Sequence, residues 1–354
     1  MNIFTNDVKV CAISAVTPNK WESLSDRYAE QEGQTFVDKF AKKAGVIGRF
    51  RAGEKQTTAD LCFAAAENLL SAQRINRDEI GAVVLVTQTG DYISPCGAEV
   101  LQYRLGLSRN CIAFDVNLGC SGFTNGLGIV GSMLSRSDCK YGLLLCGETP
   151  IRRRNPVMPI YSPDGHGEML FGDAGTAALL EKTDAVPGLR VTAKTDGSEF
   201  RAIIRPYGLY RNPVNPGGLI DESKMDELKV FQFSTSEVPK MILDYMQEAG
   251  SKPEDYDCLA LHQANKYIMD RIVKKTGFAP EQSLVSIDRF GNTSSASIPV
   301  SLVDRYGKSD GSKQLRVLAC GYGVGLSWSC VEFRVNEADI LPLTQTDEYF
   351  EDGF

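Results

Sequence analysis

The chain alternates between continuous apolar runs and longer amphipathic stretches. The runs at 79–91 (EIGAVVLVTQTGD) and 140–148 (KYGLLLCGE) lack polar alternation, which is typical of strands buried on both faces. The stretch 57–73 (TTADLCFAAAENLLSAQ) carries apolar residues at helical spacing and begins with Thr and Asp capping signals. Strands of this kind, alternating with helices, predict an α/β fold with a parallel or mixed sheet covered by helices.

The same pattern predicts further elements along the chain. Strands are expected over 7–16 and 110–116 and within 167–183, and helices over 94–107, after Cys120 and again from 226. Residues 196–224 are rich in Pro, Gly and Arg without a regular period, and so long a loop in a compact domain is usually functional or a cover. We therefore divide the chain into an N-terminal half (1–185), an irregular segment (186–225), a C-terminal half (226–336) and an acidic tail (337–354).

A weak internal repeat relates the two halves. In each, a strand ends in Gln, a helix follows, and a second strand ends in a Gly-containing turn. Gln88 and Gln263 are 175 residues apart, and Cys120 and Asn292 are 172 apart. Because ligands of α/β sheets bind at the carboxyl ends of strands, a duplicated unit would bring both turns to one face, beside His262.

Cys120 lies where an apolar strand gives way to a small-residue helix, in NLGCSG. At the start of a helix, backbone N–H groups and the helix dipole favour a thiolate, and so a nucleophile. Gly119 and Gly122 fit a sharp turn and close packing of the helix on the sheet. Most cysteines are small buried apolar residues, so this position needs support from elsewhere in the chain.

That support comes from two polar residues that follow predicted strands. The chain has two histidines, His166 and His262, so an imidazole partner for Cys120 has few candidates. His262 stands in LALHQAN and Asn292 in FGNTSSASIP, although a buried histidine and a turn asparagine are the ordinary interpretations. A thiol, an imidazole and an amide suit acyl transfer through a thioester, and backbone N–H groups of the Gly-rich stretch 321–328 could complete an oxyanion hole.

Composition narrows the class of protein. A chain of 354 residues with 43% hydrophobic residues can form one large domain or two medium ones. Its net charge of -7 and the lack of a long basic stripe argue against nucleic-acid binding. We expect a cytoplasmic protein with no membrane segment, because no window approaches the ~18 apolar residues of a span. Ten scattered cysteines without C-x-x-C, and only two histidines, argue against a disulfide framework and a metal site.

Six collinear motifs, spanning about 80–334, carry a family resemblance. They are AFDVNLGCSGF, FGDAGTAALL, MDELKVFQF, LHQANKYI, DRFGNTSSASIP and GYGVGLSW. With them the chain resembles the thiolase-fold condensing enzymes, most closely ketoacyl-ACP synthase III, as a divergent member. The resemblance implies a five-layered α/β/α/β/α fold of two pseudo-duplicated halves and a homodimer. It also implies no tightly bound cofactor, with thioesters of CoA or acyl carrier protein as substrates.

The resemblance also implies roles for single residues. Cys120 would be acylated by a thioester, while His262 and Asn292 would bind a malonyl-type extender and stabilise the enolate left by its decarboxylation. The backbone N–H of Val324 would pair with that of Cys120 as an oxyanion hole. Arg271, Lys274 and Lys275 lie at helical spacing, and the two lysines match the family's carrier-protein docking positions; a basic patch would steer the acidic carrier.

The chain departs from the family pattern at positions that contact the substrate in the family. Lys39 and Lys43 stand roughly where the family has its adenine-stacking Trp and phosphate-binding Arg, and Tyr267 replaces the Arg that follows HQAN. Together with the segment 196–224, these changes predict a specialised substrate, in a secondary-metabolite or cell-surface pathway.

Four other functions remain to be compared. An acyltransferase of the same fold would pass the acyl group from Cys120 to an alcohol or amine without decarboxylation. A papain-type hydrolase shares the residue order but lacks a CGSCW-like context. A non-catalytic subunit is disfavoured because Cys120, His262 and Asn292 are all present. Thiolase-type chemistry would use Cys320, which precedes the Gly-rich stretch, and Asn292 argues against it.

Overall fold

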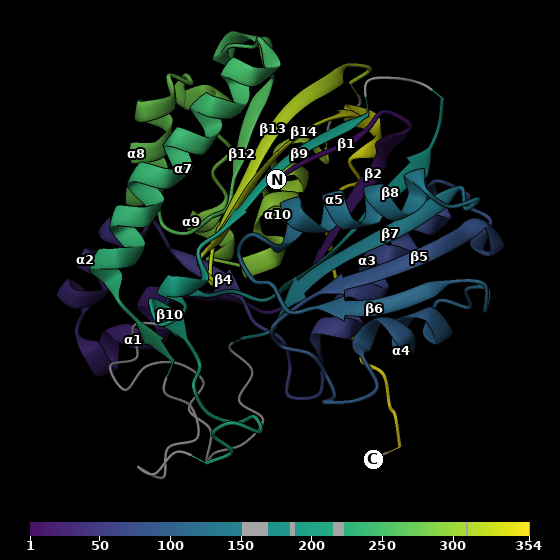
Figure 1. The fold of residues 1–354 in the computed structure, drawn as a ribbon. Coiled ribbons are helices and arrows are strands. Elements are labelled where there is room, and N and C mark those ends of the chain that lie inside the picture. Colours follow the sequence, from purple (N-terminus) through teal and green to yellow (C-terminus); the bar gives the residue numbers. More distant parts are fainter. Residues whose placement is uncertain (151–168, 185–187, 215–222, 309–310, 354) are drawn as a thin grey trace.

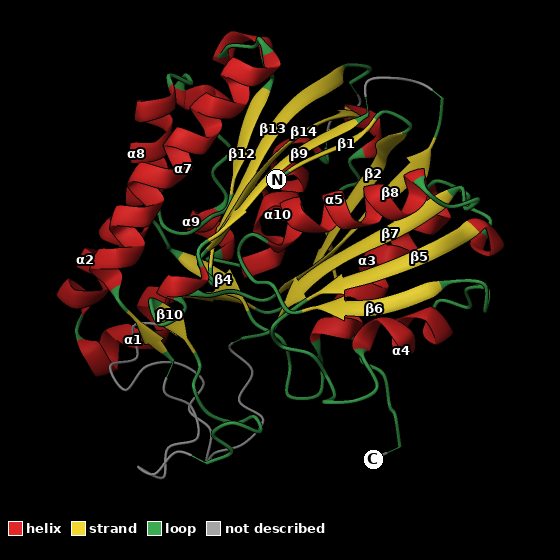
Figure 2. Cartoon of the chain, in the orientation of Figure 1, coloured by secondary structure: helices red, strands yellow, loops and turns green. Residues whose placement is uncertain are grey.

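The computed structural model describes residues 1–150, 169–184, 188–214, 223–308 and 311–353. Two β-sheets lie in the interior with helices between them and outside them (Figure 1). Strands and helices alternate along much of the chain, as the apolar pattern predicts (Figure 2). Among the described helices, none is long and apolar enough to span a bilayer.

The first sheet is mixed and has the order β15-β2-β8-β7-β5-β6. Its strands are β2 (Val8–Thr17), β5 (Ile80–Val86), β6 (Ile112–Val116), β7 (Tyr141–Glu148), β8 (Ala174–Lys182) and β15 (Thr344–Gln345). Strand β8 runs antiparallel to β2 and β7, whereas β5 runs parallel to β7 and β6. The central strands β5 and β7 are almost wholly buried, which explains their continuous apolar sequence.

The second sheet repeats this order, as β1-β9-β14-β13-β12. Its strands are β1 (Asn2–Thr5), β9 (Leu189–Thr195), β12 (Cys258–Leu261), β13 (Gln314–Gly323) and β14 (Ser327–Asn336). The run β9-β14-β13-β12 has the same pairing directions as β2-β8-β7-β5, and a parallel bridge from Leu259 to Ser283 stands in the place of β6. The internal repeat is therefore a duplication of the fold, as expected from the sequence.

Helices form the other three layers. The buried helices α5 (Gly122–Ser135) and α10 (Ser297–Tyr306) lie between the sheets and contact both (Figure 1). The outer face of the first sheet is covered by α3 (Thr58–Ala72) and α4 (Gly97–Arg104), and that of the second by α7 (Glu227–Ala249) and α8 (Lys266–Thr276). This is the five-layered α/β/α/β/α architecture of the thiolase fold.

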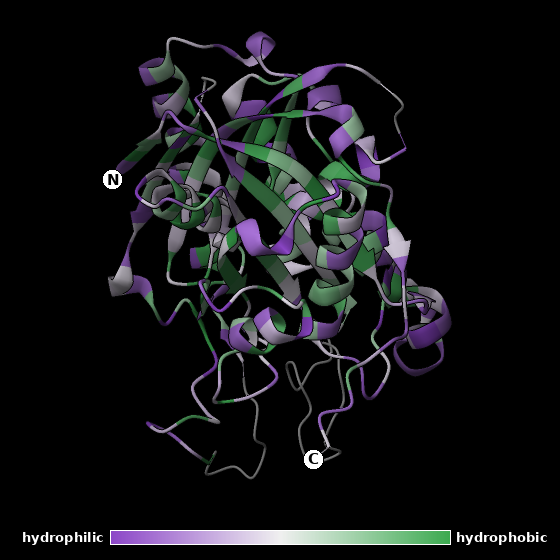
Figure 3. Ribbon diagram, turned by 90° about the vertical axis from the view of Figure 1, so that its right-hand side faces the viewer, coloured by the Kyte–Doolittle hydropathy of each residue, from purple (hydrophilic) through white to green (hydrophobic). Residues whose placement is uncertain are grey.

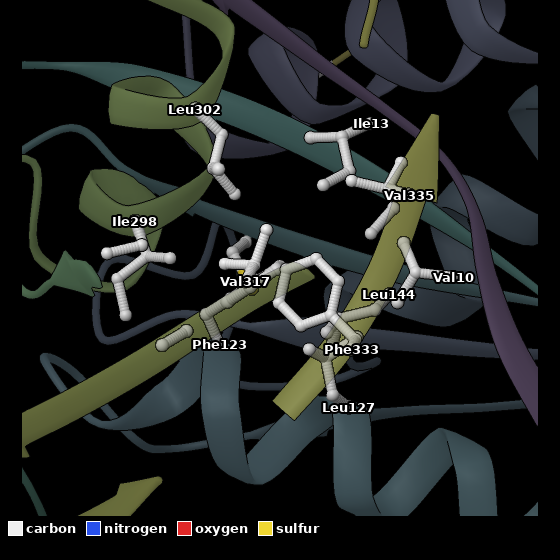
Figure 4. Packing of buried hydrophobic residues seen from close by; sticks show 14 of the residues in the cluster. Val10, Ile13, Phe123, Leu127, Leu144, Ile298, Leu302, Val317, Phe333 and Val335 are labelled. Carbon is white, nitrogen blue, oxygen red and sulfur yellow. The ribbon is translucent and has the colours of Figure 1, made fainter. Parts of the chain in front are cut away.

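The small residues of α5 let it approach both sheets closely. A Cβ on Gly126 would stand 2.5 Å from Leu144 of β7, and one on Gly122 would collide with Val86 of β5. Larger side chains fill the remaining space: Phe123 of α5 packs edge-on against Phe333 of β14, with ring centroids 6.4 Å apart (Figure 4). The central core thus joins both halves, and hydrophobic residues follow the interior strands while the outer helices carry polar ones (Figure 3).

Helix α3 begins as its sequence predicts. The Thr57 hydroxyl accepts a hydrogen bond from the Asp60 backbone N–H, and the Asp60 carboxylate accepts one from the Thr57 N–H, which is a capping box. Before α3 the chain forms β3 (Trp21–Ser23), α1 (Leu24–Glu32) and α2 (Gln34–Ala44), followed by β4 (Gly48–Phe50).

Residues 189–195 of the predicted irregular segment (186–225) form β9 of the second sheet, whereas the described residues from 196 on contain little regular structure. They form the short strands β10 (Ile203–Ile204) and β11 (Lys224–Met225), and residues 215–222 lie outside the described residues. Directly after β9, the backbone groups of Asp196 and Leu326 exchange hydrogen bonds of 2.8 and 3.0 Å. This pairing ties the segment to the Gly-rich stretch 321–328.

The residues after Asn336, predicted as an acidic tail, run along the first sheet. Strand β15 pairs with β2, and the side-chain amide of Gln56 donates to the carbonyls of Thr346 and Glu348. Beyond that point the Phe350 backbone N–H donates to a carboxylate oxygen of Asp60. We call residues 341–353 the C-terminal strap.

Candidate active site

Cys120 lies directly before α5, between the two sheets. Its backbone packs against β13: a Cβ on Gly323 would stand 2.6 Å from the Cβ and 2.9 Å from the Sγ of Cys120, and one on Gly321 would stand 2.9 Å from its carbonyl oxygen. Gly321 and Gly323 must therefore lack side chains, because a Cβ at either position would overlap Cys120. The predicted turn from strand to helix is present, with Gly119 and Gly122 packed closely as expected.

The pKa of the Cys120 thiol is raised to about 11, first by burial and second by the charge of Glu148. Hydrogen bonds from the Ser294 hydroxyl and from the backbone N–H groups of Cys120 and Val324 act in the opposite direction. The donors at the helix start favour the thiolate, as expected, but burial and the Glu148 charge act more strongly in the opposite direction. In the free protein the Cys120 side chain is therefore a thiol with hydrogen-bond donors around its sulfur.

The turn that carries Val324 is fixed by side chains on both sides. The Ser327 hydroxyl donates to the carbonyl of Val324 at 2.8 Å, and it also lies 2.6 Å from the hydroxyl of Ser121, next to Cys120. These contacts hold the Val324 N–H on the side of the thiol. The two N–H groups expected to form an oxyanion hole thus converge on the Cys120 sulfur.

His262 directly follows β12 and is buried. Its Nδ1 lies 2.7 Å from the Ser297 hydroxyl, and its ring packs edge-on against Tyr322, whose hydroxyl donates to the His262 carbonyl at 3.2 Å. Burial lowers the pKa of His262 to about 3, so the imidazole is neutral at physiological pH. A neutral ring has one N–H to donate, and the lowered pKa makes its other nitrogen a weak base for the thiol proton.

Asn292 follows α9 (Ile287–Phe290) and is held on its backbone by residues before β8. Its N–H donates to the Leu170 carbonyl at 2.8 Å, and its own carbonyl accepts the Gly172 N–H at 3.1 Å. The side-chain Oδ1 accepts the Ser294 N–H at 2.8 Å. Because Oδ1 is occupied, the Nδ2 amide is the part of the side chain left to act as a hydrogen-bond donor.

The three candidate residues are thus brought together, each from its own turn. One short segment after Asn292 connects them, since Ser294 contacts both Cys120 and Asn292 while Ser297 contacts His262. Sequence reasoning did not single out these serines. Their signal is a run of hydroxyl residues, TSSAS, directly after the candidate amide and buried throughout.

Glu148 is a further buried polar residue that sequence reasoning missed. It ends β7, and its carboxylate accepts the Gln88 N–H at 3.0 Å and the Thr89 hydroxyl at 2.7 Å. Burial raises the pKa of Glu148 to about 7, against these hydrogen bonds and the charge of Arg205 from the irregular segment. In the sequence, the signal for this residue was a carboxylate at the end of an otherwise apolar strand. The charge of Glu148 raises the pKa of the Cys120 thiol.

Cys320 does not belong to this site. Its side chain packs in the cluster between the second sheet and its outer helices, across β13 from the centre that holds Cys120. It lies opposite Cys330 on β14, and both are free thiols. This placement removes the thiolase-type alternative. Among the described residues no group of three or more His, Cys, Asp or Glu could hold a metal ion; His166 lies outside them.

The residues expected to contact substrate or carrier lie on α8 and α2. Arg271 and Lys274 are exposed on α8, with Arg271 bonded to the Tyr267 hydroxyl, while Lys275 donates to the Thr235 carbonyl at 2.6 Å. Tyr267 is half-exposed and stacks on Phe231 of α7, with ring centroids 5.7 Å apart.

Helix α2 packs beside α8 and presents Lys39 and Lys43 to solvent. The ammonium of Lys43 forms an exposed ion pair with Glu227 at 3.8 Å, at the start of α7. The lysines and Tyr267 therefore lie on neighbouring helices, on one side of the molecule.

Two regions of the chain match models of one protein family. Residues 114–197 match the family described as 3-oxoacyl-[acyl-carrier-protein] synthase III, and residues 246–335 match its C-terminal region. A β-ketoacyl-[acyl-carrier-protein] synthase III of Clostridium perfringens is 28% identical over 325 residues, which cover 91% of this chain and 97% of that protein.

Solved structures agree with this assignment. The crystal structure of a 3-oxoacyl-(acyl-carrier protein) synthase from Burkholderia xenovorans has a TM-score of 0.90 and 29% identity, covering 98% of this chain and 99% of its own. The priming β-ketosynthase of the R1128 polyketide pathway shares the fold, with a TM-score of 0.82 at 22% identity over 94% and 98% of the two chains.

Proposed function

Because the chain belongs to the ketoacyl-ACP synthase III family, as a divergent member, we propose that it catalyses decarboxylative condensation of two thioesters. The observation that carries this proposal is the pair of neutral donors beside the nucleophile. His262 is uncharged and Asn292 keeps its amide N–H groups available, as stabilising an enolate requires.

In the first half-reaction the Cys120 sulfur attacks the carbonyl of an acyl thioester. The S–C bond to Cys120 forms, the carbonyl oxygen becomes negative, and the donor thiol leaves with the proton that the Cys120 thiol gives up. The N–H groups of Cys120 and Val324 stabilise the oxygen in the tetrahedral intermediate. Burial favours the neutral thiol in the free protein, so deprotonation accompanies attack.

In the second half-reaction a malonyl-type thioester binds with its carbonyl oxygen between His262 and Asn292. Loss of CO2 leaves the electron pair of the broken C–C bond as an enolate, and the two N–H donors stabilise its oxygen. The enolate carbon then attacks the acyl group on Cys120, and the C–S bond to Cys120 breaks. A low dielectric around the buried His262 strengthens these interactions.

We propose acyl-CoA and acyl-carrier-protein thioesters as the substrates, in a specialised pathway. Support for a carrier protein comes from Arg271, Lys274 and Lys275 on α8, which present positive charge on a chain of net charge -7. Support for an unusual substrate comes from Lys39, Lys43 and Tyr267, which differ from the family pattern. No tightly bound cofactor takes part in the proposed steps.

We also propose that the protein is a homodimer joined at β6. This strand is the edge of the first sheet, Ile112 on it is 53% exposed, and Ile93 before α4 is 80% exposed. An open, apolar strand edge favours pairing with a second copy. A single-chain mass of 38.7 kDa by light scattering at working concentration would contradict the dimer.

Intact-protein mass spectrometry with a panel of acyl thioesters tests the first half-reaction. We expect the wild-type protein to gain the mass of an acyl group, and Cys120→Ala to gain none. Cys330→Ala is the matched control. This buried thiol lies in the cluster between the second sheet and its outer helices, so its loss should leave loading unchanged. A wild-type protein that gains no acyl mass from any CoA or carrier donor would contradict the proposal.

The same panel, supplied with a malonyl thioester and with alcohol or amine acceptors, separates condensation from simple acyl transfer. We expect a product lengthened by two carbons together with released CO2. An ester or amide product without CO2 would instead identify an acyltransferase of the same fold.

A further inference from the structure

The loop between β5 and α4, residues 87–96, lies beside the turn that carries Cys120. A Cβ on Gly119 would stand 2.5 Å from the Oε1 of Gln88, so the Gln88 side chain packs on the residue directly before the nucleophile. The loop, all of whose residues the structure describes, contains no helix or strand, and Gln88 and Gly90 are exposed. Its position therefore depends on contacts with other parts of the chain.

The start of α3 supplies some of these contacts. The Thr89 hydroxyl, which donates to the Glu148 carboxylate at 2.7 Å, lies 2.8 Å from the hydroxyl of Thr58. One residue earlier, the Thr57 hydroxyl lies 2.8 Å from a carboxylate oxygen of Asp91. The first turn of α3 thus contacts the loop 87–96 at two of its residues.

The same turn of α3 also holds the C-terminal strap. The side-chain amide of Gln56 donates to the carbonyls of Thr346 and Glu348 at 2.9 and 3.1 Å. The backbone N–H of Phe350 donates to the buried carboxylate of Asp60 at 3.0 Å. The strap and the loop 87–96, remote from each other in sequence, therefore meet at one turn of helix.

A direct hydrogen bond joins the strap to the loop. The Tyr92 hydroxyl donates to the Asp352 carboxylate at 2.5 Å, a distance typical of a hydroxyl bonded to a charged oxygen, and such bonds are roughly twice as strong as neutral ones. Asp352 stands two residues beyond Phe350, whose ring centroid lies 4.6 Å from the guanidinium of Arg104. Because the strap is already anchored at Phe350, little further chain entropy is lost when Asp352 meets Tyr92.

We propose that the C-terminal strap is a latch that holds the loop 87–96 against the turn of Cys120, with Tyr92 and Asp352 as its positioning residues. The strap follows the region matched to the family, which ends at residue 335, so the latch lies outside that region. By keeping Gln88 on Gly119, the latch fixes the turn before the nucleophile for the first half-reaction. Only this last consequence rests on the proposed function.

Hydrogen exchange of the free protein, followed by mass spectrometry of peptides covering 87–96, tests the latch without any substrate. Tyr92→Phe removes the hydroxyl and keeps the ring, and Asp352→Ala removes its acceptor. In both variants the amides of the loop should exchange roughly threefold to tenfold faster, because local opening becomes more frequent when a hydrogen bond to a charged group is lost. Peptides from β7 should exchange as in the wild type, which separates loosening of the loop from global destabilisation.

Two further variants of the strap serve as controls. Asp352→Asn keeps an acceptor for the Tyr92 hydroxyl and should recover most of the protection. Glu351→Ala removes the same charge from the neighbouring residue, whose carboxylate instead pairs with Lys55 and accepts the Tyr349 hydroxyl, and it should exchange like the wild type. Unchanged exchange of 87–96 in both Tyr92→Phe and Asp352→Ala would overturn the latch.

Acylation of Cys120 by a saturating acyl-CoA thioester measures the consequence for the first half-reaction. The rate constant of loading should fall roughly threefold to tenfold in Tyr92→Phe and Asp352→Ala, since a displaced turn misplaces the nucleophile, and Asp352→Asn should restore most of it. Loading at the wild-type rate in variants whose loop exchanges faster would overturn the positioning role. If the wild type itself gains no acyl mass, the proposed function fails, and hydrogen exchange still decides whether the latch exists.

Discussion

At the scale of residues, burial shifts the pKa values of the candidate site residues more than the helix start does. Cys120 has three donors around its sulfur, yet desolvation and Glu148 raise its pKa to about 11. The same burial lowers the pKa of His262 to about 3 and keeps it neutral. The site therefore holds few charges at rest and is arranged for charge that develops during reaction.

Glu148→Gln should make Cys120 more reactive above neutral pH. The Glu148 charge raises the pKa of the thiol, and the pKa of Glu148 itself is about 7, so the wild-type charge is present at pH 8 and absent at pH 5.5. Iodoacetamide should therefore alkylate Cys120 faster in the variant at pH 8, and the two proteins should converge at pH 5.5. A variant that reacts no faster at pH 8 would show that this charge does not reach the thiol.

The same substitution should change the pH dependence of stability. The pKa of Glu148 is raised from 4.5 to about 7 on folding, so its contribution to stability is full below pH 4.5 and is lost as pH rises through 7. Glu148→Gln should thus gain ~2–3 kcal/mol in the free energy of unfolding relative to the wild type between pH 5 and pH 8. Urea unfolding at both pH values measures this difference, and a constant difference would contradict it.

At the scale of elements, sequence patterns predict the strands and helix ends whose formation depends on local chemistry. The apolar runs identified β2, β5 and β7, and Thr57 with Asp60 identified the start of α3. Strands β1 and β9 escaped detection because both are partly exposed, and their position depends on pairing with distant segments. Ser297 contacts His262, which is remote in sequence, so the hydroxyl run TSSAS marks its position but not its partner.

The C-terminal strap offers a prediction at this scale. Arg104 lies between the rings of Phe63 and Phe350, 4.5 and 4.6 Å from their centroids, and pairs with the buried Asp60 at 2.9 Å. Phe350→Ala should lower the free energy of unfolding by ~1–2 kcal/mol, because it removes a partly desolvated cation–π contact and apolar burial.

Tyr349→Ala is the control within the strap. The Tyr349 hydroxyl bonds the exposed Lys55 and Glu351, so its loss should change stability by less than ~0.5 kcal/mol. Thermal or urea unfolding of both variants measures the contrast. Equal effects would mean that Arg104 does not anchor the strap.

At the scale of the whole molecule, duplication explains why one site needs both halves. Cys120 comes from the first half, His262 and Asn292 from the second, and α5 and α10 meet between the sheets. The sequence repeat predicted this convergence. The expected substrate, by contrast, depends on exposed residues of α2 and α8 and on the irregular segment, where the pattern of apolar positions carries little information.

Positive charge on α8 gives a prediction about partners. Arg271→Glu with Lys274→Glu should raise KM for a carrier-protein thioester about tenfold at low salt, because the carrier is acidic, and should leave kinetics with a CoA thioester nearly unchanged. Lys252→Glu, a lysine on the loop after α7, serves as a control for net charge. Equal effects on both donors would show that the two residues act on the common site and not on carrier docking.

The most direct test of the condensation account measures two events in one variant. In Asn292→Ala, intact mass should show normal acylation of Cys120, while release of CO2 from a malonyl thioester falls ~100-fold or more, because the enolate loses one of its two donors. Acyl loading and CO2 release are followed in the same samples beside the wild type. Release of CO2 at the wild-type rate from the acylated variant would contradict the account.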